Sequence, residues 1–100
     1  MAVTCSRWER LIEKAEREGN KEKALEFREK LVECVVYMAQ GLIARGRSRD
    51  LDEAEELLKY GDEVGNKLGI NELLFHVNLL RKKIEEKRER RRPKEAEAKQ

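Results

Sequence analysis

The side chains best suited to chemistry are few, and they lie far apart in the sequence. His76 is the only histidine, and no Cys, Asp or second His stands at ligand spacing from it. Ser6 and Ser48 have no adjacent base that could activate a hydroxyl nucleophile, and they are typical of a helix cap and a loop. The glycines end helices or lie within them, and they form no phosphate-binding loop. We therefore predict no catalytic, cofactor-binding or metal-binding residue, and no enzymatic activity.

The two cysteines do not form a recognisable motif. Cys5 and Cys34 lie too far apart for a CxxC pair, and two thiols cannot complete a tetrahedral zinc site alone. Cys34 lies within an apolar stretch, where a free thiol behaves as a small hydrophobic side chain. We expect both cysteines to be reduced in an intracellular chain, in preference to a disulfide.

A helix that is apolar nearly all round is predicted at residues 31–44, LVECVVYMAQGLIA. Only Glu33, Gln40 and the hydroxyl of Tyr37 interrupt it. Glu33 and Gln40 are seven residues apart, so they share a face and mark its expected exposed edge. No second acid accompanies Glu33 in an apolar setting to form a carboxylate pair. Such a helix must be covered by other helices or by a partner, which predicts a central helix with the others packed around it.

A basic run near the C-terminus is the strongest sign of a function beyond folding. It consists of Lys87, Arg88, Arg90, Arg91, Arg92 and Lys94. Such a cluster opposes the helix dipole favourably and needs no partner, whereas phosphate binding would make it sensitive to salt. No aromatic residue interleaves with it, and Glu85, Glu86 and Glu89 dilute its field. We favour a solvated tail and do not expect nucleic acid as a partner, with binding through this run as the alternative.

The composition is that of an all-α protein. Charged residues make up 44% of the chain, with eighteen Glu but three Asp, one Thr and one Pro. Glu, Lys, Arg, Leu and Ala favour helices, and the scarce types are used at helix ends. Periodicity and end signals predict four helices, at about residues 7–18, 21–45, 51–68 and 72–91, packed around the long second one. The handedness of this packing is left undetermined.

Capping residues predict where the helices begin. Ser6 with Glu9 has the spacing of a capping box and predicts the start of the first helix. Asp50 with Glu53 predicts the start of the third in the same way, after a basic loop at residues 47–49. Asn20 is placed to cap the second helix.

The glycines have two predicted roles. Gly19, Gly46 and Gly69 end helices, because glycine adopts the left-handed conformation without penalty. Gly41, Gly61 and Gly65 fall inside helical patterns, where a glycine costs about 1 kcal/mol relative to alanine. We predict that these three lie where another helix approaches closely.

The chain is long enough for one core. We predict a single helical domain at residues 1–92 and a disordered charged tail at residues 93–100, beginning at Pro93. The longest apolar run, residues 34–39, is far shorter than the ~20 residues that span a bilayer. The N-terminus lacks the basic start and apolar core of a secretory signal. We expect a cytoplasmic protein without a membrane partner.

Two stretches resemble helix hairpins of the tetratricopeptide repeat family. The better match consists of Val35, Met38, Ala39, Leu42, Gly46, Ala54, Leu58 and Gly61, with a three-residue insertion at 47–49. A poorer one consists of Trp8, Leu11, Gly19 and Ala24. The two hairpins begin 27 residues apart where the family expects ~34, so the second helix would serve both. The resemblance implies a protein–protein interaction module, with Phe75 and Leu79 off the main apolar stripe of the last helix.

The chain is also similar to computationally designed helical proteins assembled from overlapping natural hairpins. The similarity rests on complete caps, surfaces rich in Glu, Lys and Arg, and the scarcity of Thr, Pro and Asp. It implies a structural scaffold without natural function, produced in the cytoplasm of an expression host and requiring no partner. A homodimer or a protein partner is left open.

Overall fold

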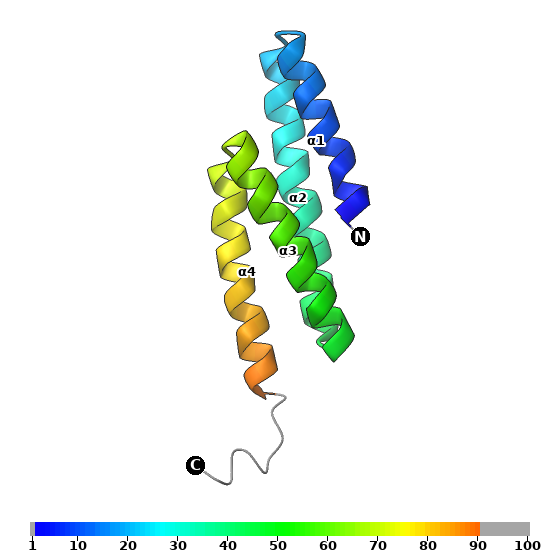
Figure 1. Cartoon of the computed structure of the whole chain (residues 1–100), viewed down its shortest axis with the longest axis vertical. Helices are drawn as coiled ribbons and strands as arrows, with labels where there is room; N and C mark the ends of the chain where they lie inside the picture. Colours follow the sequence, from blue (N-terminus) through cyan, green and yellow to red (C-terminus); the bar gives the residue numbers. More distant parts are fainter. Residues whose placement is uncertain (1, 91–100) are drawn as a thin grey trace.

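The protein consists of four helices, shown in a computed structural model that describes residues 2–90 (Figure 1). The helices are α1 (Ala2–Arg17), α2 (Lys21–Arg45), α3 (Ser48–Leu68) and α4 (Asn71–Arg90). No strand occurs among the described residues, as the all-α prediction requires. The predicted tail at 93–100, the predicted stop before Pro93 and the predicted helix end at residue 91 lie outside the described residues.

The second helix has the predicted bounds because both of its ends are capped. The Asn20 side chain accepts a hydrogen bond from the Lys23 N–H at 3.1 Å, which satisfies a free amide of the first turn. Gly46 ends the helix at φ +65°, and its N–H donates to the Leu42 carbonyl at 3.1 Å. Tyr37 is 69% exposed and Glu33 and Gln40 are exposed beside it, which confirms the predicted exposed edge.

The first helix begins earlier than predicted. Ser6 is not an N-cap, because α1 starts at Ala2 and Ser6 lies within it, accepting a hydrogen bond from Arg10 Nη1 at 3.4 Å. A Ser three residues before a Glu is compatible with a helix interior as well as with its start. Residues 2–5 contain no Pro or Gly that would prevent the helix from extending towards the N-terminus.

The third helix also begins earlier than predicted. It starts at Ser48 after Arg47, whose side chain makes no capping bond, so Asp50 is not the cap. Asp50 lies in the first turn and is only 4% exposed. Its carboxylate accepts from Arg47 Nε at 2.9 Å and from Arg45 Nε at 3.5 Å. The guanidinium groups and the helix N-terminus both favour the negative charge of Asp50. Because α3 begins at Ser48, the connection between α2 and α3 is two residues long and not the predicted loop at 47–49.

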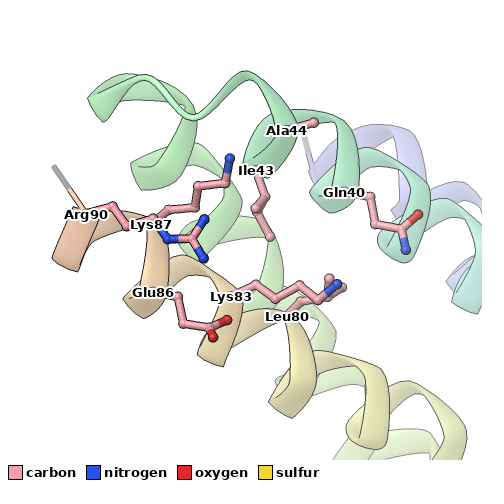
Figure 2. Close-up of a pocket in the computed structure, with 8 residues that line it drawn as sticks. All are labelled: Gln40, Ile43, Ala44, Leu80, Lys83, Glu86, Lys87 and Arg90. Carbon is pink, nitrogen blue, oxygen red and sulfur yellow. The ribbon is translucent and has the colours of Figure 1, made fainter.

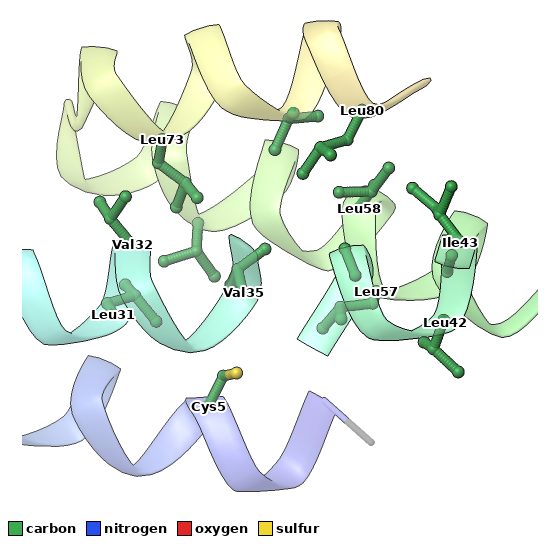
Figure 3. Close-up of a cluster of buried hydrophobic side chains, with 14 of the residues drawn as sticks. Cys5, Leu31, Val32, Val35, Leu42, Ile43, Leu57, Leu58, Leu73 and Leu80 are labelled. Atoms are coloured by element: carbon green, nitrogen blue, oxygen red, sulfur yellow. The ribbon is translucent and has the colours of Figure 1, made fainter. Parts of the chain in front are cut away.

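The helices form two hairpins that are offset along the long axis of the molecule (Figure 1). The first is α1 with α2, and the second is α3 with α4; α2 contacts all three other helices. Buried side chains from all four helices form one core, part of which is drawn in Figure 3. The Cα atoms span 60 × 20 × 15 Å. Within residues 2–90, no helix combines the length and the hydropathy needed to span a membrane.

Two of the glycines lie where α4 packs closely against α3. A Cβ atom on Gly61 would lie 3.0 Å from Val77 Cγ2, and one on Gly65 would lie 2.7 Å from Leu74 Cδ2. The predicted close contacts at these two positions are therefore confirmed. The prediction is wrong for Gly41, where nothing lies within 4 Å of the Cβ position.

Contacts between helices are also made by a disulfide and by polar side chains. Cys5 and Cys34 are disulfide-bonded, with their Cα atoms 5.7 Å apart, so the prediction of two reduced cysteines is wrong. The bond joins α1 to α2, because the packing of these helices brings together residues distant in sequence. Arg28 of α2 donates to the Leu68 carbonyl at 2.7 Å and to Glu16 at 3.3 Å, and so connects α1, α2 and the end of α3.

Candidate nucleic-acid interface

A groove lies between the C-terminal halves of α2 and α4 (Figure 2). It has a volume of about 400 Å³ and is lined by Gln40, Ile43, Ala44, Leu80, Lys83, Glu86, Lys87 and Arg90. Ile43 and Leu80 are buried and supply an apolar floor, beside the exposed methyl group of Ala44. The groove therefore combines an apolar floor with charged walls.

The α4 wall is cationic. Lys83, Lys87 and Arg90 follow one another at spacings of four and three residues, which places them along one side of the helix. Within residues 2–90, none of the three forms an ion pair with a carboxylate. Figure 2 shows Lys83 and Lys87 extending towards α2, whereas the Glu86 carboxylate points away from it. Three cations are therefore available at the groove.

Lys87 also lies against the end of α2. Its Nζ is 3.7 Å from the position that a Cβ atom on Gly46 would occupy. Gly46 is the C-terminal cap of α2, and the negative end of a helix dipole favours a cation nearby. The α2 C-terminus thus helps to hold the Lys87 ammonium group at the mouth of the groove.

The neighbouring Arg88 has a structural role instead. It donates from Nη1 to Glu55 and from Nη2 to Asp52, both at 2.9 Å, and thereby joins α4 to α3. The hydrogen bond with Glu55 raises the pKa of Arg88, and Arg88 in turn lowers the pKa of Glu55. The predicted basic run is therefore not one uniform solvated surface. Its remaining members, residues 91, 92 and 94, lie outside the described residues.

The other residues singled out in the sequence do not come together in a site. The His76 ring packs edge-on against Phe75 at a centroid distance of 5.6 Å, and no group of metal-ligating side chains occurs in the described part of the chain. Ser6 and Ser48 lie on different helices: Ser6 is within α1 and Ser48 is the first residue of α3. Glu33 pairs with Lys30 at 3.8 Å.

Sequence reasoning missed the groove itself. The predicted basic run does not include Lys83, and the sequence predicts only an exposed-edge position for Gln40. The distribution of charge was the available signal: residues 1–80 hold 13 Lys and Arg against 16 Asp and Glu, whereas residues 81–100 hold 10 against 5. The positive charge of the chain is therefore concentrated at its C-terminal end, which the net charge of +2 conceals.

A comparison with protein families identifies the family of the chain. The family model for archaeal ribosomal protein aL49 matches residues 4–91, which includes nearly all of the four helices. The chain belongs to the aL49 family. No curated protein matches it significantly.

Membership of the aL49 family corrects the two resemblances inferred from sequence. The chain is not a designed protein, because a natural family accounts for its length from residue 4 to residue 91. The tetratricopeptide resemblance is also wrong: the family match treats both hairpins as one unit, and residues 48 and 49 of the supposed turn insertion are helical. Complete caps and charged surfaces are ordinary properties of a helical protein. Phe75 and Leu79 are exposed, but their exposure alone identifies no repeat.

The aL49 family also bears on activity, location and partners. A ribosomal protein family is structural, so the prediction that the protein is not an enzyme is confirmed. Ribosomal proteins are cytoplasmic, so the predicted cytoplasmic location is confirmed. The expectations that no partner is required, and that nucleic acid is not one, conflict with membership of a ribosomal family.

Proposed function

We propose that this protein is a structural component of the archaeal ribosome and that it contacts ribosomal RNA through the C-terminal half of α4. The observation that carries the proposal is the row Lys83, Lys87 and Arg90, which has no carboxylate partner among the described residues and faces an open groove. Lys and Arg side chains are the usual ligands of phosphate oxygens. The chain belongs to a family of ribosomal proteins, and ribosomal RNA carries a phosphate at every nucleotide.

Other basic residues lie near the C-terminal half of α4 and support RNA binding at this end of the molecule. Arg45, Arg47 and Arg49 lie at the α2–α3 connection, adjacent to the end of α4, because Lys87 approaches Gly46 there. Asp50 pairs with Arg45 and Arg47, and the hydrogen bond from Arg47 lowers the pKa of Asp50. Asp50 is therefore charged at neutral pH and neutralises part of the positive charge of this region.

The test is binding of the full chain to total ribosomal RNA over a series of salt concentrations. Counterion release makes the logarithm of the affinity fall with the logarithm of salt by about 0.7–0.9 for each phosphate contact. The triple substitution Lys83→Gln, Lys87→Gln and Arg90→Gln is expected to weaken binding and to make this slope shallower by about two to three.

A matched control removes the same charge from the other end of the molecule. Lys14→Gln, Arg17→Gln and Lys21→Gln lie around the α1–α2 turn, far from the end of α4 in Figure 1, and all three side chains are exposed. We expect this triple variant to keep the wild-type slope. Equal slopes for the two triple variants would contradict the proposal.

We also infer that α2 is the element around which the other three helices are arranged, within one domain at residues 1–92. Support comes from the contacts of α2 with α1, α3 and α4, while α1 and α4 do not touch within the described residues. The proposal further holds that the chain has no catalytic, cofactor-binding or metal-binding residue and acts through its surface alone.

A further inference from the structure

The groove between α2 and α4 has features that simple attraction to phosphates does not require. Phosphate contacts need only exposed cations, and they are independent of what lies beneath them. Here the cations of α4 border an apolar floor made by Ile43, Ala44 and Leu80. An apolar floor contributes to binding only when an apolar or aromatic group covers it.

The size of the groove suits a small ring system. Its volume of about 400 Å³ falls within the ~300–1,000 Å³ that small-molecule sites occupy. The backbone of a continuous RNA duplex would touch only the rim, because the bases of a duplex are stacked inside it. An unpaired base has a free flat face and can leave the stack.

The groove walls offer the groups that an unpaired nucleotide needs. The guanidinium plane of Arg90 can stack on a base, and the amide of Gln40 can donate to and accept from a base edge. Lys83 and Lys87 are one helical turn apart, so their ammonium groups can bind phosphates on either side of the inserted base.

The geometry therefore points to the α2–α4 groove as a binding site for a single unpaired nucleotide of RNA. The base lies on the floor of Ile43, Ala44 and Leu80, and the flanking phosphates contact Lys83 and Lys87. This inference rests on the proposed function, since it specifies which RNA structure the basic end of α4 binds.

A second groove of similar size lacks the row of cations that the proposed RNA binding requires. It lies at the α1–α2 turn and has a volume of about 500 Å³. Its Arg28 already bonds to Glu16 and to the α3 carbonyls, and Glu16 itself lines the groove. That groove therefore offers no comparable row of available cations.

The experiment compares the full chain on two RNAs, a short hairpin with one bulged adenosine in its stem and the same hairpin fully paired. Base stacking is worth about 1–3 kcal/mol per base, and we expect the bulged RNA to bind at least about fivefold more tightly. The substitution Ala44→Phe fills the groove without changing charge. It is expected to abolish the preference for the bulge, so that the variant binds the two hairpins equally.

The control is Leu25→Phe, which adds an aromatic ring at an exposed apolar residue of the second groove. This variant is expected to keep the wild-type preference. Circular dichroism establishes that each variant is folded, and Ala44→Gln replaces Ala44→Phe if the latter does not fold.

The possible results separate the inference from the proposed function. Equal wild-type affinity for the two hairpins, with a steep salt dependence, would overturn the nucleotide site and leave RNA contact through α4 intact. A bulge preference that survives Ala44→Phe would place the site elsewhere. Groove-dependent binding of a poly-glutamate peptide, without any bulge preference, would overturn it in favour of an acidic protein partner.

Discussion

Gly61 and Gly41 lie in helices of the same molecule in opposite settings. A Cβ atom on Gly61 would be 3.0 Å from Val77 Cγ2 and 3.2 Å from Val35 Cγ1, and both valines are fully buried. Nothing lies within 4 Å of the Cβ position on Gly41. The helical pattern of the sequence is the same around both, so only the structure distinguishes a packing requirement from an open position.

The pair makes a test of packing at single residues. Gly41→Ala is expected to raise the free energy of unfolding by up to about 1 kcal/mol, because alanine favours the helix. Gly61→Ala gains the same propensity but overpacks two stiff β-branched side chains, at a cost of about 1–3 kcal/mol, and is expected to destabilise by roughly 1 kcal/mol net. Urea unfolding followed by circular dichroism measures both. Stabilisation by Gly61→Ala equal to that by Gly41→Ala would contradict the contact.

At the residue scale, sequence signals were reliable where one residue decides the conformation. Gly19, Gly46 and Gly69 all adopt positive φ at helix ends, as predicted. The predictions of Ser6 and Asp50 as caps are wrong because their polar groups can form hydrogen bonds inside the first turns of a helix as well as at a cap. The place of Lys83 in the candidate interface could not be predicted from a contiguous basic run, because it depends on which residues share a face of α4.

Hydrogen bonds between side chains connect α1 to α3. Tyr60 of α3 donates to Glu9 at 2.9 Å, and Lys67 donates to Glu9 at 2.9 Å and to Glu13 at 3.4 Å. Burial raises the pKa of Glu9, but the hydrogen bonds from Lys67 and Tyr60 outweigh it and hold the pKa below the ordinary value of 4.5. Burial, followed by the bond to Glu9, raises the pKa of Tyr60.

This cluster predicts an acid-sensitive contact between two helices. The lowered pKa of Glu9 means that its stabilising effect is fully present above 4.5 and is lost as the pH falls through the lower pKa of the folded state. We expect Glu9→Gln to be less stable than the wild type at neutral pH and to lose less stability in acid. Thermal unfolding across the acidic range measures this. Parallel pH profiles for the two proteins would show that Glu9 does not contribute.

At the element scale, the existence and order of the helices could be predicted, and their mutual placement could not. The bounds of α2 followed from Asn20 and Gly46, which act locally. The offset of the two hairpins depends on contacts across 40 residues or more, such as Arg28 with the Leu68 carbonyl. The groove between α2 and α4 exists only after this placement, so no local pattern could reveal it.

The disulfide constrains the molecule as a whole. It joins Cys5 of α1 to Cys34 of α2 across 29 residues. Disulfides are rare in the cytosol, with the intracellular proteins of hyperthermophilic archaea as an exception, which is why the sequence favoured free thiols. The link matters because α1 has contacts with only two other helices among the described residues.

Removal of this link is expected to weaken the whole fold. Replacing both cysteines by alanine should lower the free energy of unfolding by about 2–4 kcal/mol, since the open chain gains entropy when unfolded. Equilibrium unfolding with and without reductant measures it. The reductant should destabilise the wild type and leave the double variant unchanged. Two titratable free thiols in the native, untreated protein would contradict the disulfide.

The slender shape of the molecule has a consequence for its stability when no partner is bound. Two packed helices need about 14 Å, from ~9 Å between axes and a Cα radius of ~2.3 Å on each side, so dimensions of 20 and 15 Å leave no room for a thick interior. A body with so much surface for its volume has little stability in reserve. A partner that binds only the folded form adds to that reserve by mass action. If the protein is a component of the ribosome as proposed, copies that are not bound there are expected to unfold more often and to be degraded sooner.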